Sequence, residues 1–232
     1  MRNDDVLNSQ PFFTIIITTY NRAQLLKRAL NSLITQTEED WEAIIVDDDS
    51  SDNTYSEVLP YIKSDGRIKY SRKAHGGDAH AKNEGVRLSE GKYISFLDSD
   101  DEFKPTHLES RKAILIQNPS VRFLYGGAEI IGNQYVPDRF DYANKININQ
   151  CVIGGTFFIE RNILISLNGF KDILIGTDAD LFEKVKKARV TMLKTDPATY
   201  IYHREAHDSI TNNLYRGIER FNTQKVIDRI GE

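Results

Sequence analysis

The sequence lacks the features that mark several common classes of protein. Cys151 is the only cysteine among the 232 residues, so neither an internal disulfide nor a cysteine zinc cluster can form. No apolar stretch reaches the about 18 residues that a membrane span requires. The first residues, MRNDDVLNSQPFF, are polar and acidic and do not resemble a secretory signal. We therefore expect a cytoplasmic protein, with peripheral contact at the inner face of the cell membrane as a further option.

Basic charge and glycine-rich phosphate loops are also missing. The formal net charge of −4 argues against a nucleic-acid partner. The first predicted strand is followed by no G-x-G-x-x-G, and no G-x-x-x-x-G-K-[ST] occurs, so dinucleotide and P-loop sites are unsupported. Any phosphate ligand must be handled by other means, and clustered carboxylates that hold Mg²⁺ or Mn²⁺ are one such means.

The first half of the chain alternates short apolar segments with helical patterns. Strands are expected at residues 12–19, 41–47 and 68–72 and from Lys92 onward, and helices begin after each, the last at Pro105. Asn21 with Gln24 resembles a capping box for the first helix. This alternation predicts an α/β fold with a parallel sheet and helices on both faces.

Polar clusters follow three of these strands. They are TTYNR (18–22), VDDDSSDNT (46–54) and FLDSDD (96–101). Ligands of parallel sheets bind at the carboxyl ends of the strands, so all three clusters are expected at one binding edge. The carboxylates of Asp98, Asp100 and Asp101 repel one another unless a cation lies among them. The alternative interpretation is a polar turn that caps the next helix.

The second half has a different rhythm and predicts mixed or antiparallel strands that face a second substrate. Strands are expected at 121–131 and 153–160, with a polar, irregular segment at 133–150. Gly154, Gly155 and Thr156 open the later strand, as a flat backbone near a ligand or as a bulge. Asp178 begins a helix, where a carboxylate either caps the helix or serves as a catalytic base.

The expected organisation is one domain over residues 12–211, preceded by a tail (1–11) and followed by an amphipathic helix (212–232). The two histidines His203 and His207 lie four residues apart near the end of this domain, but no H-E-x-x-H motif is present.

Taken in order, these segments resemble the family 2 inverting glycosyltransferases of the GT-A fold. The resemblance covers residues 12–211 and rests on seven ordered motifs: TTYNR, VDDDSSDNT, AKNEG (81–85), FLDSDD, GGTFFIER (154–161), GF followed by TDADL (169–181), and YHREAHDSIT (202–211). It implies a Rossmann-like, mostly parallel central sheet with a smaller mixed or antiparallel part on the acceptor side. Residues 12–118 would form the nucleotide-sugar-binding half of the domain and residues 119–211 the acceptor-binding half.

The resemblance also implies roles for individual residues. The donor nucleotide, expected to belong to a UDP-sugar, would contact Thr19, Tyr20, Arg22, Asp47, Asp48, Lys82, Asn83, Asp98 and Ser99. Within this set, Asp48 would accept a hydrogen bond from uracil N3–H, a role that suits a carboxylate. Asp98 would hold the ribose or the sugar.

The remaining roles concern the metal, the base and the acceptor. Asp100 would bind Mn²⁺ or Mg²⁺, with His207 as a second ligand, and Asp178 would be the general base. Gly154, Gly155, Thr156, Thr177 and Arg204 would line the acceptor and donor-sugar region, with Arg204 near the diphosphate. The acceptor would be a saccharide or lipid-linked saccharide in bacterial polysaccharide synthesis.

Four positions depart from the usual pattern of the family. Asp49 replaces a glycine, His75 an asparagine, Lys82 an arginine and Thr177 a glutamate. Lysine keeps the charge of arginine but loses its planar fork of donors. None of the four departures removes the expected metal ligand or the expected base.

Two alternatives remain open. A sugar-nucleotide-forming nucleotidyltransferase would also use acidic metal ligands, but it would carry a glycine-rich basic loop after the first strand, which TTYNRAQLLKRAL lacks. A non-catalytic nucleotide-sugar-binding module would keep the fold without turnover. The presence of both Asp100 and Asp178 argues against that module.

Overall fold

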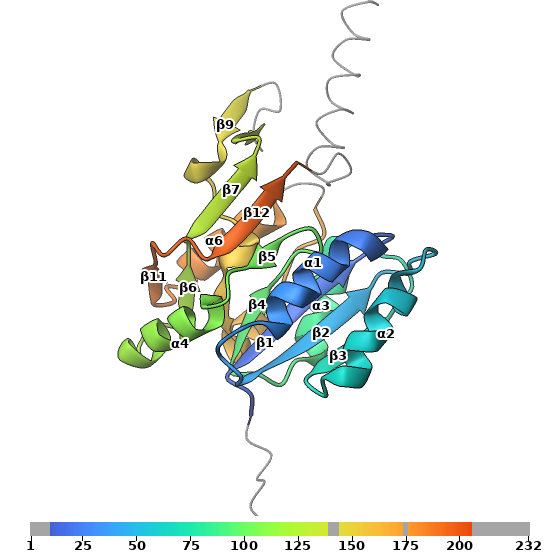
Figure 1. Cartoon of the computed structure of the whole chain (residues 1–232). Coiled ribbons are helices and arrows are strands. Elements are labelled where there is room, and N and C mark those ends of the chain that lie inside the picture. Colours follow the sequence, from blue (N-terminus) through green and yellow to red (C-terminus); the bar gives the residue numbers. More distant parts are fainter. Residues whose placement is uncertain (1–9, 139–143, 174–175, 206–232) are drawn as a thin grey trace, which may run out of the picture.

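A seven-stranded mixed sheet forms the centre of the protein (Figure 1). The computed structural model describes residues 10–138, 144–173 and 176–205. In spatial order the strands are β11 (Met192–Lys194), β6 (Phe123–Tyr125), β10 (Phe158–Glu160), β4 (Tyr93–Phe96), β1 (Phe13–Thr19), β2 (Trp41–Asp47) and β3 (Ile68–Arg72). β4, β1, β2 and β3 are mutually parallel, whereas β10 runs antiparallel to both β4 and β6. The mostly parallel sheet that the sequence predicted is therefore confirmed.

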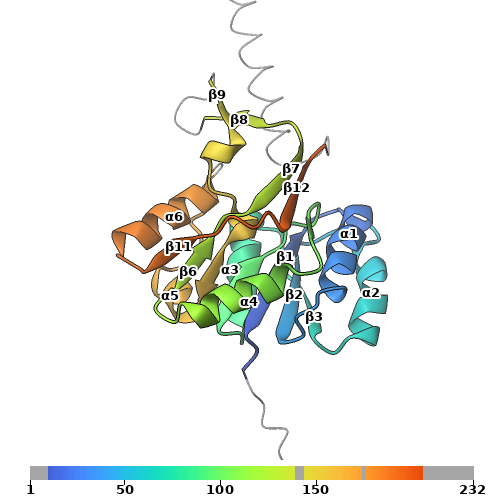
Figure 2. The ribbon, with the colours of Figure 1, turned by 60° about the vertical axis from the view of Figure 1, so that its left-hand side comes forward.

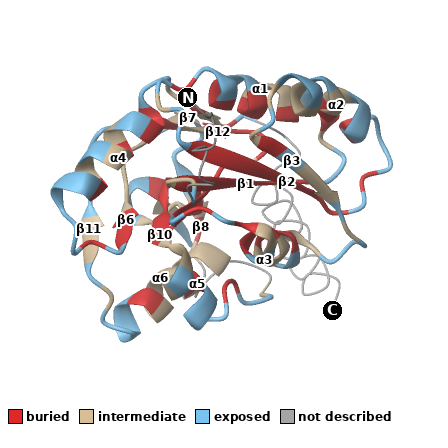
Figure 3. Ribbon diagram, turned by 90° about the horizontal axis from the view of Figure 1, so that it is seen from below, coloured by how far each residue is buried: buried red, intermediate tan, exposed pale blue. Residues whose placement is uncertain are grey.

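Helices cover both faces of this sheet (Figure 3). One face packs against α1 (Ala23–Ile34), α2 (Thr54–Ser64) and α4 (His107–Gln117), and the other against α3 (Asp78–Leu88), α5 (Arg161–Ser166) and α6 (Thr177–Lys187). The alternation of strand side chains explains the two layers, because Ile15 and Ile17 belong to the first core cluster and Ile16 to the second. In α1, buried Leu26, Leu30 and Leu33 recur at helical spacing.

A smaller part extends above the sheet edge (Figure 2). It contains the sheet β5 (Glu102–Phe103), β12 (Tyr200–Arg204) and β7 (Ala128–Gly132), together with the hairpin of β8 (Tyr135–Pro137) and β9 (Lys145–Asn147). β12 pairs in parallel with β7 and antiparallel with β5. Mixed pairing on this side was predicted, but the segment 133–150 is not irregular throughout, since it contains the hairpin and a 3₁₀ turn (Ile148–Gln150).

The single strand predicted at 121–131 is wrong, because the chain breaks between β6 and β7. Gly126 and Gly127 have φ angles of 97° and 79°, in the region that glycine adopts readily and other residues rarely do. A Cβ atom on Gly127 would lie 2.2 Å from the carbonyl oxygen of Pro197. The break sends β6 into the main sheet and β7 into the smaller one.

Two further local predictions need correction. The strand expected from residue 153 begins only at Phe158, after a 3₁₀ turn at Gly154–Thr156. The capping box of Asn21 and Gln24 is absent, since the N-cap residue of helix α1 is Arg22 and no side chain caps the helix there. Instead, Asp52 accepts a hydrogen bond from the amide of Ala23 at 3.1 Å. The predicted C-terminal helix lies outside the described residues.

Candidate active site

The polar strand ends converge on one edge of the sheet, where the order of the strands reverses. β1 lies between β2 and β4, and Thr19 at the end of β1 is in register with Asp47 at the end of β2. The turn after β4 begins beside β1, because the amide of Leu97 donates to the carbonyl oxygen of Ile16 at 3.0 Å. Such a switch point is the usual ligand site of an open α/β sheet. The predicted common edge is therefore present.

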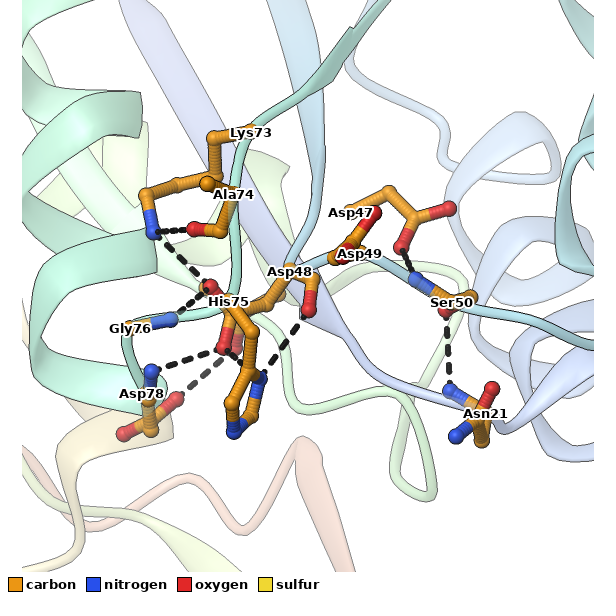
Figure 4. Close-up of polar contacts among 12 residues, drawn as sticks. Asn21, Asp47, Asp48, Asp49, Ser50, Lys73, Ala74, His75, Gly76 and Asp78 are labelled. Carbon is orange, nitrogen blue, oxygen red and sulfur yellow. Dashed lines mark hydrogen bonds and ion pairs between the residues drawn. The ribbon is translucent and has the colours of Figure 1, made fainter.

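Asp48 lies at the centre of a dense set of donors from the loop after β3 (Figure 4). Its carboxylate accepts hydrogen bonds from the amides of Gly76 and Gly77 at 2.9 and 2.7 Å. Lys73 Nζ and His75 Nδ1 lie 2.8 and 2.9 Å from its two oxygens. Burial raises the pKa of Asp48, but the bonds from Lys73 and the two amides outweigh burial and hold the pKa below its usual value.

The other acidic side chains of this turn, residues 47–52, are also engaged within the chain. Asp47 accepts hydrogen bonds from the hydroxyl of Tyr70 at 2.6 Å and the amide of Ser50 at 2.7 Å. Asp49 pairs with Arg72 at 2.8 Å. The carboxylate positions of this first acidic turn are thus already bonded to the protein. A nucleobase that donates a hydrogen bond to Asp48, as predicted, would have to share the Asp48 carboxylate oxygens with these donors.

Tyr20 and His75 form an aromatic pair beside Asp48. Their ring centroids lie 4.4 Å apart, and Tyr20 is 46% exposed. The resemblance implies that Tyr20 borders the nucleobase, and an exposed tyrosine ring is suited to such a contact. Thr19 next to it is buried and its hydroxyl has no hydrogen-bond partner among the described residues.

The second acidic turn, residues 98–101, contains three carboxylates in different environments. Asp101 is fully buried and accepts hydrogen bonds from the Tyr200 hydroxyl at 2.5 Å and the His203 amide at 2.8 Å. Burial raises the pKa of Asp101 well above its usual value, and the nearby Asp98 and Asp100 act in the same direction. Asp101 therefore joins the turn to β12 and is not available to a ligand.

Asp100, the expected metal ligand, pairs with Arg22. The distance from Asp100 Oδ2 to Arg22 Nη1 is 3.0 Å, and the backbone oxygen of Asp100 accepts a hydrogen bond from Arg28. This contact brings the end of TTYNR and the turn after β4 together. Ser99 between the two outer carboxylates is buried.

Asp98 is the carboxylate of this turn that lies nearest to Lys82. No described residue donates a hydrogen bond to its carboxylate, and the side chain remains 37% exposed. The nearest cation is Lys82, whose Nζ lies 3.8 Å away. Desolvation raises the pKa of Asp98 to about 6, against the opposing effect of Lys82 and with further contributions from the nearby carboxylates.

Lys82 lies among three carboxylates. Its Nζ is 2.8 Å from Asp78, 3.8 Å from Asp98 and 4.0 Å from Asp178, and its side chain is only 7% exposed. Burial lowers the pKa of Lys82, but the three carboxylates outweigh it and raise the pKa well above its usual value. Lys82 is therefore a buried, charged ammonium group at the centre of the site.

Asp178 occupies the first turn of α6 and faces the turn at Gly154. Its Oδ2 accepts a hydrogen bond from the Gly154 amide at 3.1 Å. A Cβ atom on Gly154 would lie 2.4 Å from the Asp178 carboxyl group, and one on Gly155 would lie 2.2 Å from the Tyr200 ring. Thr177 lies beside Asp178, the predicted base, with its hydroxyl 3.5 Å from Asp178 Oδ1. The two glycines thus leave room for side chains that define the site.

Asn83 and Thr156 make framework contacts. The Asn83 side chain donates to the Phe170 carbonyl oxygen and accepts from the Phe170 amide, both at 2.8 Å. Thr156 is buried, and its hydroxyl accepts from the Gly126 amide at 3.1 Å. Their expected roles toward the donor and acceptor stay predictions.

Arg204 and Tyr202 bring β12 to the site. Arg204 is buried and donates to the Tyr135 carbonyl oxygen at 3.2 Å, and its guanidinium lies 5.7 Å from the Tyr202 ring. Burial raises the pKa of Tyr202 to about 12, Arg204 opposes this, and the charges of Asp101 and Asp98 add to it. The pairing of β12 with β5, which begins directly after Asp101, places this strand beside the acidic turn.

Sequence reasoning missed Asp78, Tyr200 and Tyr202. Asp78 had a detectable signal, because it precedes Lys82 by four residues in the first turn of α3. The two tyrosines had none, since their contacts depend on the pairing of β12. His207 lies outside the described residues, and within the described ranges no group of three or more His, Cys, Asp or Glu residues could hold a metal.

Comparison with known proteins identifies the class. The family described as Glycosyl transferase family 2 matches residues 14–174, which is more than half of the chain. The chain belongs to this family. The predicted family is confirmed, and the nucleotidyltransferase alternative loses its support.

Curated relatives include two bacterial glucosyltransferases. The UDP-Glc:alpha-D-GlcNAc-diphosphoundecaprenol beta-1,3-glucosyltransferase WfgD of Escherichia coli is 36% identical over 157 residues, covering 65% of this chain and 61% of the relative. The GalNAc(5)-diNAcBac-PP-undecaprenol beta-1,3-glucosyltransferase of Campylobacter jejuni is 28% identical, covering 89% of this chain and 70% of the relative. The chain thus spans about three fifths of the E. coli relative's length.

Solved structures confirm the GT-A fold. S. aureus TarS 1-349 in complex with UDP-GlcNAc matches with a TM-score of 0.69 at 20% identity, over 85% of this chain and 60% of TarS 1-349. The mannosyltransferase PcManGT from Pyrobaculum calidifontis, in complex with GDP-Man and Mn2+, matches with a TM-score of 0.63 at 18% identity, over 84% of this chain and 57% of PcManGT. No helix within the described ranges is both long and apolar enough to cross a membrane.

Proposed function

We propose that this protein transfers a sugar from a UDP-sugar to a hydroxyl group of a lipid-linked saccharide, with inversion at the anomeric carbon, in bacterial glycan synthesis. One observation carries the proposal: Asp98 and Asp178, which come from opposite halves of the chain, lie within 3.8 and 4.0 Å of the same ammonium group. A direct displacement requires a residue that holds the donor sugar and a general base, both close to the same reacting carbon.

The donor proposal rests on the site and on the relatives. The exposed Tyr20 ring at the end of β1 offers a stacking surface for a base. The E. coli relative is named for UDP-Glc, and TarS has been solved with UDP and with UDP-GlcNAc. These names favour a uridine nucleotide over guanosine. The acceptor proposal follows from the two relatives named for acceptors linked to undecaprenol by a diphosphate.

In the proposed reaction, Asp178 accepts the proton of the acceptor hydroxyl as that oxygen attacks the anomeric carbon. The bond from this carbon to the diphosphate oxygen breaks, and its electron pair leaves with UDP. One displacement inverts the configuration, and no nucleophilic side chain is needed. The hydrogen bond from the Gly154 amide orients the Asp178 carboxylate. Buried Thr156 supports the turn that supplies this amide.

The charges at the site fit a divalent cation. Four carboxylates, those of Asp78, Asp98, Asp100 and Asp178, face the two basic side chains Lys82 and Arg22. The diphosphate of a donor would add to this negative excess. We therefore propose Mn²⁺ or Mg²⁺ as cofactor, held by Asp100, with phosphate oxygens and His207 as further ligands. When bound, the ion neutralises charge on the leaving diphosphate.

Calorimetric titration of UDP, GDP and dTDP, each with and without Mn²⁺, tests the proposal. We expect metal-dependent binding of UDP and weaker binding of the other two. Transfer is then measured from UDP-glucose to a diphosphate-linked N-acetylglucosamine lipid, with the anomeric configuration of the product assigned by NMR. Binding without transfer would support the non-catalytic module, and a folded sample that binds none of the nucleotides would contradict the donor site.

A further inference from the structure

Lys82 occupies a position that its expected role as a nucleotide-lining residue does not explain. It is the side chain through which the carboxylates of Asp98 and Asp178 are linked, although these residues belong to different halves of the chain. Both ion-pair distances, 3.8 and 4.0 Å, exceed hydrogen-bond length. A single charge between two carboxylates reduces their mutual repulsion and restricts their orientations.

Asp78 and Thr18 hold the ammonium group of Lys82 in place. Asp78 Oδ2 lies 2.8 Å from Lys82 Nζ, four residues earlier on α3. The other oxygen of Asp78 accepts a hydrogen bond from the Thr18 hydroxyl at 2.9 Å, on β1. The contacts from Thr18 to Asp78 and from Asp78 to Lys82 thus fix the flexible lysine side chain to β1. Because lysine carries three N–H donors, one can serve Asp78 while two remain toward the other carboxylates.

The ring of Phe170 also lies close to the Lys82 ammonium group. The Phe170 ring centroid lies 5.4 Å from Lys82 Nζ. Asn83, the next residue on α3, fixes the backbone of Phe170 with two hydrogen bonds of 2.8 Å. Gly169 has a φ of 58° and no room for a Cβ, which would lie 2.2 Å from Asn83 Oδ1. The segment before α6 is therefore tied to the helix that carries Lys82.

We propose that Lys82 is a positioning residue whose ammonium group is anchored by Asp78 and Thr18. It fixes the relative positions of two carboxylates: Asp98, which is expected to contact the donor sugar, and Asp178, the proposed general base. This inference rests on the proposed transferase function. It predicts that loss of the ammonium group slows the chemical step more than it weakens nucleotide binding. A nucleotide-lining lysine would behave in the opposite way, because its removal would weaken UDP binding and leave turnover of bound donor intact.

Steady-state kinetics and UDP calorimetry on Lys82→Met, Lys82→Arg and Thr18→Val test this. We expect kcat to fall about 100-fold in Lys82→Met, with the donor KM and the UDP Kd changed less than about threefold. Lys82→Arg keeps the charge and should recover at least about a tenth of wild-type kcat. Thr18→Val keeps the branched shape and removes only the hydroxyl that holds Asp78, so kcat should fall about threefold to tenfold.

Several results would overturn the inference. A UDP Kd raised tenfold or more in Lys82→Met with kcat preserved would make Lys82 a nucleotide ligand, and unchanged kcat in both Lys82→Met and Thr18→Val would leave it no role in positioning. Metal-dependent UDP binding by Lys82→Met shows that this variant is folded, and Thr18→Val supplies the test if it is not. Lys27→Met, on the outer face of α1 where Lys27 pairs with Glu57, is the matched control and should keep wild-type kinetics. If the wild-type protein transfers no sugar, the proposed function fails instead.

Discussion

The two acidic turns of this protein have similar sequences and opposite electrostatics. In the turn after β2, Asp47 and Asp48 accept short hydrogen bonds from their own chain. In the turn after β4, Asp98 accepts none from any described residue and Asp100 depends on one arginine. The pKa of Asp48 is lowered, whereas burial raises the pKa of Asp98 to about 6.

This difference separates the parts that the two turns play. A carboxylate with several internal donors stabilises the fold and shapes a binding surface. A carboxylate that accepts no hydrogen bond from the chain is costly for the fold and suits a site that binds cations or donors supplied by a ligand. We infer that the first turn mainly supports the structure beside the expected nucleobase, and that the second turn is the reactive part of the site.

The largest expected effect is on transfer. Asp178→Asn keeps the size of the side chain but cannot accept a proton, so the transfer rate should fall by a factor of about 10³ to 10⁴. UDP binding with Mn²⁺, measured by calorimetry, should stay within about twofold. Glu183→Gln changes a surface carboxylate on the same helix and serves as the control. Loss of UDP binding in Asp178→Asn would contradict its assignment as the base.

Metal dependence should separate the two turns next. Asp100→Asn should abolish the increase in UDP affinity that Mn²⁺ produces, about 10-fold to 100-fold in the wild type, because a carboxylate ligand is lost. Calorimetry with and without EDTA measures this increase. Asp49→Asn, in the first turn, should retain it, since Asp49 is exposed and pairs with Arg72. Retention in Asp100→Asn would move the metal site elsewhere.

A substitution in the first turn should reduce the stability of the fold more than one in the second turn. Asp48→Asn should lower the free energy of unfolding by about 3 kcal/mol, because its amide nitrogen would face donors that now bond to a carboxylate oxygen. Asp98→Asn should lower it by less than about 0.5 kcal/mol, because a poorly compensated charge is removed. Urea unfolding at pH 7 compares the two variants. Equal losses would mean that the turns do not differ in the way that the hydrogen bonds indicate.

The smallest effect is a pH dependence of the Asp48 contribution. The folded pKa of Asp48 lies below the reference value of 3.8, so its stabilisation is complete above that value and is lost as pH falls through the folded pKa. The stability difference between wild type and Asp48→Asn should therefore shrink as pH falls below about 3.8. Urea unfolding across this range measures it. A difference that grows toward low pH would contradict the sign.

Much of the main sheet could be predicted because its signals are local. The strands Trp41–Asp47 and Ile68–Arg72 have the predicted bounds, and the segment at 12–19 begins only one residue later, at Phe13. Continuous β-branched runs identify buried strands without knowledge of their neighbours. The second half was less predictable, because the break at Gly126 and Gly127 depends on the close approach of Pro197, about 70 residues later.

The candidate site was predicted in the same uneven way. Strand ends placed Asp98 and Asp100 among the candidates, and the family resemblance added Asp178 at a helix start. The structure brings Asp98 and Asp178 to one lysine. The capping of α1 was missed, because Asp52 reaches Ala23 from another strand end. Tyr202 was missed because nothing in its local sequence indicates that β12 lies beside the acidic turn.

The sequence by itself determined the alternation of strands and helices, the family and the edge of the sheet at which polar side chains gather. These follow from residue periodicity and from motif order, which are local properties. Only the tertiary structure decided which carboxylates the chain satisfies and which it leaves open. Asp48 and Asp98 differ because Lys73, Gly76 and Gly77 donate hydrogen bonds to the Asp48 carboxylate, whereas Lys82 Nζ lies 3.8 Å from the Asp98 carboxylate. Such distances arise from the packing of distant segments, which no short stretch of sequence encodes.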